Sequence, residues 1–119
     1  IGDALAAAAL RGVKVVELQD NVASHQGKFQ GPKLLAAGGA VFIDKRHAIA
    51  HNKIIIIDGQ TVLTGSFNFS DNAENKNAEN LLVIKNDPAL VEKYSQNWSN
   101  HLAHCLAYVP ALTSPKATP

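Results

Sequence analysis

The sequence predicts an α/β fold in which a mixed β-sheet is flanked by helices. A helical pattern near the N-terminus is followed at once by a strand pattern, which is typical of α/β layering. Four consecutive isoleucines at residues 54–57 precede Asp58-Gly59, a strong signal for a β-hairpin. The chain has 119 residues, 46% of them hydrophobic, which is enough for one core and too little for two. We therefore expect one domain over residues 1–109 and a disordered tail over residues 110–119.

The first predicted elements are a helix over residues 4–11 and a strand over residues 13–18. Asp3 is a residue type that caps helices, and Gly12 is a typical helix stop. The segment 13–18 is apolar and bounded by polar residues, as a short strand requires. A helix and a strand this close together place the strand in a layer beneath the helix.

A polar segment over residues 21–31 follows, and we expect it to be a loop. Pro32 fits the first turn of a short helix that ends at the glycine pair 38–39. The apolar residues 40–43 then predict a second short strand. These elements complete the half of the fold that precedes the hairpin.

The hairpin is predicted to join strands over residues 48–57 and 60–66 through Asp58-Gly59. This dipeptide favours a type I′ turn of two residues, because both positions tolerate positive φ. A two-residue turn fixes which residues face each other across the ladder. The facing pairs are then His51 with Ser66, Lys53 with Thr64, and Ile55 with Val62.

The last third of the chain predicts a loop over residues 71–77, a buried strand over residues 81–84 and a terminal helix. Asp87-Pro88 supplies the cap and the first-turn residue of that helix. Apolar residues recur along it at helical spacing and are expected to face the core. They are Leu90, Val91, Tyr94, Trp98 and Leu102.

Composition narrows the class of protein only modestly. A net charge of +1 and a pI near 8.1 fall short of the strongly basic balance of many nucleic-acid binders. The basic run at residues 45–47, with Lys28 and Lys33 upstream, is equally well explained as a phosphate-binding patch or a solvated turn. Cys105 stands alone, so an internal disulfide is excluded, and no apolar run has the length of a membrane span.

The most informative pattern in the chain is a set of six residue types at fixed spacing around the hairpin. It reads H-x-K-x4-D-x6-G-S-x-N and comprises His51, Lys53, Asp58, Gly65, Ser66 and Asn68. Side chains alternate between the two faces of a strand. His51, Lys53, Ser66 and, if the strand continues, Asn68 are therefore expected to project from one face.

These residues supply the groups that phosphodiester cleavage requires. A neutral imidazole at His51 can attack phosphorus and form a covalent intermediate. Lys53 places a cation beside the phosphate oxygens, and Asn68 and Ser66 can bind the same oxygens through hydrogen bonds. Asp58 lies seven residues from His51, about 20 Å along an extended strand, and is therefore expected to be structural, like Gly65.

The pattern resembles the signature of the phospholipase D superfamily. The likeness extends to residues 65–70 and to Ala78-Glu79-Asn80-Leu81, which resemble the small bacterial endonucleases of that family that carry one motif per chain. The resemblance implies a phospholipase D-like fold from which the opening strand and helix are missing. It also implies that Asp58 lies outside the reacting groups.

The resemblance also identifies a supporting carboxylate for the catalytic histidine. Glu79 is the candidate to accept a proton from the second ring nitrogen of His51, and Glu74 is its competitor. No metal or other cofactor is expected, because the sequence contains no recognised ligand motif. The remaining histidines are expected to be ordinary surface or half-buried residues; they are His25, His47, His101 and His104.

A second group is needed to protonate the leaving oxygen, and the chain has no second H-x-K pattern. Small single-motif relatives form homodimers, so the resemblance implies a two-fold dimer that brings two copies of His51 together. The expected substrate is DNA or RNA, without stable membrane insertion. The compartment is left open between cytosol and periplasm, with export the expectation because many small bacterial relatives are exported.

Three alternatives to the nuclease hypothesis stay open. One is hydrolysis of phospholipid headgroups, which would require an apolar rim around the site. Another is a nucleic-acid-binding module without catalysis, which the intact His51 and Lys53 disfavour. The third, a purely structural hairpin, would leave His and Lys side chains on one strand face without partners.

Overall fold

The first part of the chain, together with residues 106–107, forms a mixed three-stranded sheet with helices packed on it. The structure is a computed structural model and describes residues 1–110. β1 (Val16–Asp20) pairs in parallel with β2 (Ala40–Asp44), and β6 (Leu106–Ala107) pairs antiparallel with β2. The mixed sheet flanked by helices confirms the predicted fold class, and β6 is a strand that the sequence did not predict.

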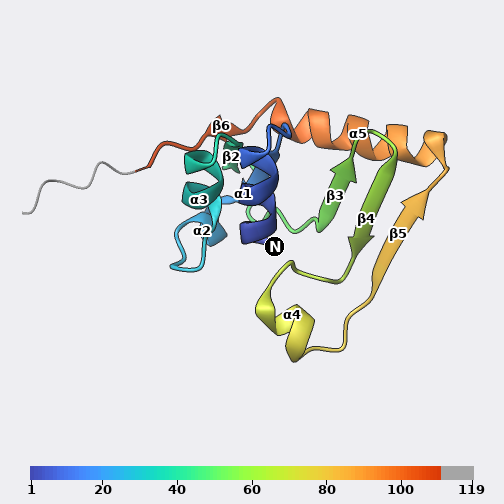
Figure 1. Ribbon diagram of the computed structural model, residues 1–119, viewed down its shortest axis with the longest axis horizontal. Coiled ribbons are helices and arrows are strands. Elements are labelled where there is room, and N and C mark those ends of the chain that lie inside the picture. The colour runs from blue at the N-terminus through green and yellow to red at the C-terminus, as the bar shows by residue number, and fades with distance from the viewer. Residues whose placement is uncertain (111–119) are drawn as a thin grey trace, which may run out of the picture.

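Two helices, α1 (Gly2–Leu10) and α3 (Gly31–Ala36), pack together over this sheet (Figure 1). Leu34 on α3 and Val41 and Ile43 on β2 form the buried centre of this half of the molecule. Each such side chain contributes about 1.5–3 kcal/mol through burial. The predicted short helix at Pro32 and the strand after it are thus confirmed.

The predicted start of the first helix was wrong by two residues. The helix begins at Gly2 with Ile1 as its N-cap, and no side chain caps it. Asp3 lies inside the first turn, where it forms an ion pair with Lys33 on α3. The carboxylate therefore links two helices instead of capping one.

The segment predicted as a loop over residues 21–31 begins with a single helical turn, α2 (Asn21–Ser24). Asp20 ends β1 and acts as the N-cap, because its carboxylate accepts a hydrogen bond from the Ala23 N–H at 3.0 Å. This local cap stabilises a turn that the polar composition concealed. β1 itself begins later than predicted and runs to Asp20.

The second sheet is antiparallel and has the strand order β3-β4-β5. Its strands are β3 (Ile54–Ile57), β4 (Thr61–Gly65) and β5 (Leu81–Lys85). The predicted hairpin is present, but its first strand is much shorter than residues 48–57. The residues that precede Ile54, including the motif histidine, lie outside the ladder.

The hairpin turn has the predicted backbone but the predicted pairing is wrong by one residue. Asp58 and Gly59 have φ values of 55° and 62°, and the Gln60 N–H donates to the Ile57 carbonyl at 3.0 Å. Ile57 nevertheless pairs with Thr61, so Gln60 is a third loop residue. This extra residue shifts the register of the whole hairpin.

The motif glycine Gly65 lies where β4 and β5 approach most closely. A Cβ at this position would lie 2.2 Å from the carbonyl oxygen of Asn80. Gly65 pairs with Leu81, and the next residue, Ser66, donates its N–H to the same Asn80 carbonyl at 3.1 Å. Glycine is required here because a side chain would push the two strands apart.

Residues 71–77, predicted as a loop, contain the short helix α4 (Asp71–Asn75). Ser70 caps it, because its hydroxyl accepts a hydrogen bond from the Ala73 N–H at 3.3 Å. Asp71 and Glu74 lie in its first turn, where acidic side chains are favourable. Capping and charge thus outweigh the polar composition on which the loop prediction relied.

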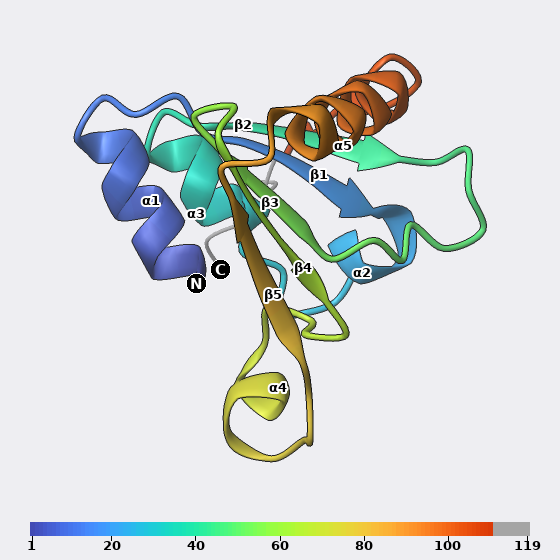
Figure 2. The same ribbon diagram turned by 90° about the vertical axis from the view of Figure 1, so that its right-hand side faces the viewer.

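The terminal helix α5 (Pro88–Leu102) packs across both sheets (Figures 1 and 2). Asp87 caps it as predicted, accepting a hydrogen bond from the Leu90 N–H at 3.0 Å. Val91 on α5 is buried, and the other residues of the predicted apolar stripe are half-buried. The stripe therefore contributes to packing, but only Val91 is fully in the core.

β5 is an edge strand, whereas the sequence predicted a buried one. Leu81, Leu82 and Val83 are 41%, 60% and 55% exposed. In the strand order of its sheet only β4 pairs with it. The predicted tail lies outside the described residues apart from its first position. Among residues 1–110, no helix has the length and apolar character needed to cross a bilayer.

Candidate active site

Three strand ends meet at one edge of the second sheet, the edge that runs across the strands, and this brings the motif together. β3 begins, β4 ends and β5 begins at this edge, as the pairs Ile54 with Thr64 and Gly65 with Leu81 require (Figure 1). The residues just outside the ladder there come from three separate segments. They are His51 to Lys53, Ser66 to Asn68, and Glu79 with Asn80.

His51 and Lys53 precede β3 in extended chain. The His51 side chain is exposed, and its ring makes no hydrogen bond within the part of the chain that the structure describes. Lys53 is half-buried as a residue, and its ammonium donates to the His51 carbonyl at 2.6 Å. The lysine is therefore held beside the histidine while the imidazole stays free for chemistry.

Ser66 and Glu79 form the best-defined hydrogen-bond network of the site. The Ser66 hydroxyl donates to the Glu79 carboxylate and accepts the Asn80 N–H at 3.1 Å. Asn77 donates its side-chain amide to the other Glu79 oxygen at 3.2 Å. The network fixes the end of β4 against the start of β5.

The predicted contact between Glu79 and His51 is not present, because the Glu79 carboxylate is bound to Ser66 and Asn77. β4 lies between β3 and β5, so the ends of those two strands are about two strand spacings, roughly 10 Å, apart. Glu74, the competing acid, lies in α4. The Glu79 carboxylate is therefore engaged in the network at the start of β5.

The prediction that strand alternation alone places His51 and Ser66 on one face was wrong. In the observed register Ile55 pairs with Leu63. If the ladder continued beyond Ile54 in this register, His51 would pair with Phe67 and not with Ser66. The motif gathers because strand ends converge, not because its residues face each other. Asp58 lies in the turn at the opposite end of the sheet, as predicted.

Asp20 anchors the segment that leads into the motif. Its carboxylate accepts the N–H of Ala50, the residue before His51, at 2.7 Å, in addition to capping α2. Burial raises the pKa of Asp20, but hydrogen bonds from the backbone of Ala50, Ala23 and Val22 outweigh it and hold the pKa below its usual range. This charged acceptor fixes the backbone position of His51.

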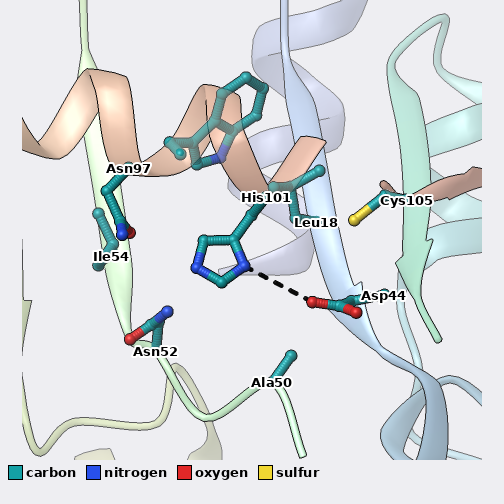
Figure 3. A pocket seen from close by; sticks show the side chains of 9 residues that line it. Leu18, Asp44, Ala50, Asn52, Ile54, Asn97, His101 and Cys105 are labelled. Atoms are coloured by element: carbon teal, nitrogen blue, oxygen red, sulfur yellow. Dashed lines mark ion pairs between the residues drawn. The ribbon is translucent and has the colours of Figure 1, made fainter. Parts of the chain in front are cut away.

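A second polar cluster adjoins the motif and was not predicted. Asp44, only 2% exposed, ends β2, and His47, His101 and His104 surround its carboxylate. Figure 3 shows His101 pointing from α5 toward Asp44 in a pocket whose wall includes Ala50 and Asn52. Sequence reasoning treated these histidines separately. The spacings D-x-x-H at 44–47 and H-x-x-H at 101–104 were the available signal.

The comparisons with known proteins concern the family of the chain. Residues 1–102 match the family model described as "Cardiolipin synthase, PLD-like domain". A phospholipase D of Rickettsia felis is 48% identical over 103 residues, which are 87% of this chain and 51% of that protein. A mitochondrial cardiolipin hydrolase of Chlamydomonas reinhardtii is 39% identical over 88 residues, 74% of this chain and 39% of that protein.

Among solved structures, Nuc from Salmonella typhimurium, a phospholipase D family member, matches with a TM-score of 0.84 and 36% identity. The match covers 92% of this chain and 74% of that one. NucT from Helicobacter pylori matches with a TM-score of 0.74 and 26% identity, over 89% and 72% of the two chains. The chain spans about half the length of the Rickettsia phospholipase D proteins that it matches.

The family model, the curated relatives and the fold all indicate the same superfamily. The chain belongs to the phospholipase D superfamily.

Proposed function

We propose that the protein is a metal-independent phosphodiesterase and that its substrate is a nucleic acid, DNA first and RNA second. The observation that carries this proposal is the convergence of His51, Lys53 and the Ser66–Glu79 network at one sheet edge. His51, Ser66 and Asn68 are exposed, so the site is open to an extended polymer. Lys45 and Arg46 are exposed, make no ion pair within residues 1–110, and lie in the connection to His51.

The proposed reaction has two steps. The His51 imidazole attacks phosphorus, a phosphorus–nitrogen bond forms, and the bond to the leaving oxygen breaks as that oxygen takes a proton. Water then attacks phosphorus, the phosphorus–nitrogen bond breaks and the imidazole is restored, while the water proton passes to the group that protonated the leaving oxygen. Lys53 and Asn68 stabilise the phosphate oxygens in both steps, because their donors lie at the same sheet edge. Glu79 and Ser66 position this edge, since the Ser66 proton is already directed to Glu79.

The proton for the leaving oxygen is proposed to come from His51 of the partner subunit in a two-fold dimer. The exposed apolar residues Leu81, Leu82 and Val83 support a subunit contact, because β5 begins directly after Glu79 and Asn80. Two identical imidazoles that lie close together repel each other when both are charged. One copy then acts as nucleophile and the other as acid.

Phospholipid headgroup hydrolysis is the second candidate function. The names of the Rickettsia and Chlamydomonas relatives favour it. The exposed apolar residues of β5 also lie beside the site, where a lipid surface could contact them. Both candidates use the same attack on phosphorus and differ only in what the phosphate is attached to.

The test is cleavage of labelled single-stranded DNA, double-stranded DNA, RNA, and phosphatidylcholine and cardiolipin vesicles, all in excess EDTA. The protein is compared with His51→Ala and with His25→Ala, a control whose exposed histidine is hydrogen-bonded to Asn21. We expect nucleic-acid cleavage that His51→Ala abolishes and His25→Ala preserves. Cleavage of vesicles alone would establish the lipid function. Binding of DNA without any cleavage would show a silent binding module.

A further inference from the structure

We propose that Asp44, His47, His101 and His104 bind one Zn²⁺ ion in a structural site that is separate from the catalytic motif. Each of the four residues offers one ligand atom, and these atoms all lie within 4.8 Å of one another. Three imidazoles and one carboxylate form a donor set that suits Zn²⁺. Four protein ligands complete a tetrahedral shell, which is typical of structural zinc.

The distances around the carboxylate fit such a shell. Asp44 Oδ2 lies 2.8 Å from His47 Nδ1, 3.2 Å from His104 Nε2 and 3.7 Å from His101 Nδ1. Ligand bonds of about 2.0–2.1 Å in a tetrahedron place neighbouring donors roughly 3.3 Å apart. The three observed distances bracket this value, so a small movement of the rings would complete the site.

Hydrogen bonds satisfy this cluster incompletely. His47 Nδ1 and His104 Nε2 lie within hydrogen-bond distance of Asp44 Oδ2, whereas His101 Nδ1 is too far from it. Neighbouring ring centroids lie only 5.1–5.4 Å apart, so the three rings can each present a nitrogen to one central ion. One cation at the centre would satisfy all four groups.

Backbone hydrogen bonds orient the Asp44 carboxylate so that its Oδ2 oxygen is available to a cation. Its Oδ1 accepts the N–H groups of Arg46 at 2.9 Å and His47 at 3.2 Å, which leaves Oδ2 directed at the three imidazoles. Hydrogen bonds of this kind orient the ligands of metal sites. The His47 side chain is 45% exposed, so an ion can reach the site from solvent.

The position of the site gives it a structural role. Asp44 and His47 belong to the connection from β2 to His51, whereas His101 and His104 belong to the last turn of α5 and the residues after it. A bound ion would therefore tie this connection to the helix that covers both sheets (Figure 3). No step of the proposed reaction uses the ion.

Binding is tested by isothermal titration of ZnCl₂ into the purified protein after removal of bound metal. The expected result is one ion per chain, with affinity reduced at least about tenfold in His101→Gln and in His104→Gln. His25→Gln is the matched control and should bind as the unchanged protein does. Circular dichroism identifies any variant that fails to fold, and His101→Gln, at a half-exposed position, guards against that outcome.

Geometry and stability give independent readouts. Co²⁺ in the site should show the strong visible absorption of tetrahedral cobalt, and Zn²⁺ should raise the melting temperature of the protein but not that of His104→Gln. Absence of binding would overturn the proposal. Equal loss of affinity in His25→Gln, or the weak spectrum of octahedral cobalt, would overturn it as well.

Discussion

At the scale of single residues, the Ser66 hydroxyl links the two parts of the catalytic edge. It donates to Glu79 and accepts from the Asn80 backbone, so its loss frees both neighbours. We predict that Ser66→Ala and Glu79→Ala each lower kcat about 10–100-fold, the equivalent of one charged hydrogen bond. Because the two residues act as one unit, the double variant should be little worse than either single variant. Steady-state kinetics of the three variants provide the measurement, and additive losses would contradict the shared role.

Asp20 provides a pH-dependent contribution to stability. Its pKa is lower in the folded protein than in the unfolded chain, so its stabilising effect is fully present above the ordinary aspartate pKa of about 3.9. The effect is lost as the pH falls through the lower folded-state value. We therefore predict that Asp20→Ala is less stable than the unchanged protein at pH 7 and that the difference narrows below about pH 4.

Urea unfolding of both proteins across this pH range, in EDTA, measures the effect. A difference in stability that stays constant down to pH 3 would show that the carboxylate charge of Asp20 is not what holds Ala50. Cleavage activity at pH 7 should fall in the same variant, because the backbone before His51 loses its anchor.

The sequence predicted the motif residues more securely than their arrangement. His51, Lys53, Ser66 and Glu79 do reach one sheet edge. The structure shows Glu79 hydrogen-bonded to Ser66 and Asn77, and the role of Glu79 toward His51 stays a prediction. Strand order decides which strand ends are neighbours, and the local sequence does not specify that order. The histidine cluster joins residues up to 60 positions apart, and only the packing of α5 on β2 brings them together.

At the scale of elements, the close contact of β4 and β5 depends on Gly65. A methyl group there would lie 2.2 Å from a backbone oxygen, which cannot move without separating the strands. We predict that Gly65→Ala destabilises the protein by about 1–3 kcal/mol and disorders the Ser66–Glu79 network. Gly27→Ala is the matched control, because a Cβ at Gly27 meets nothing within 4 Å. Thermal unfolding of the two variants compares them, and equal stability would contradict the account.

The hairpin shows why elements are easier to predict than register. The isoleucine run and Asp58-Gly59 were sufficient to locate the hairpin and its turn, and both central residues have the positive φ that was expected. They were not sufficient for the length of the first strand, which begins only at Ile54. Whether Gln60 joins the ladder or the loop depends on how β4 pairs with β5, which is a tertiary contact. Short helices such as α2 and α4 are difficult to predict from composition for a similar reason, because a single side-chain cap is enough to stabilise each of them.

At the scale of the whole molecule, the exposed edge of β5 is the surface on which the proposed dimer depends. Leu82 is 60% exposed and lies three residues from Glu79. We predict that Leu82→Glu shifts the protein to a monomer and lowers cleavage in parallel, because a buried charge is costly and each site needs the second imidazole. Leu10→Glu, at a 75% exposed position on α1, is the control.

Light scattering coupled to size exclusion, together with activity as a function of protein concentration, tests this prediction. A protein that is monomeric at concentrations where it is fully active would contradict the shared site. The same result would leave the role of His51 as nucleophile untouched, because the proton could then come from another group.

His51 is expected to become covalently bonded to phosphorus during turnover, and the whole proposed reaction depends on this bond. The most direct measurement is intact mass spectrometry of the protein mixed briefly with a single-stranded oligonucleotide in EDTA and quenched in alkali. We predict a covalent adduct between His51 and the oligonucleotide fragment that carries the phosphoryl group. Acid should release this adduct, and His51→Ala should not form it. Cleavage that continues in His51→Ala, or an adduct on another residue, would contradict it.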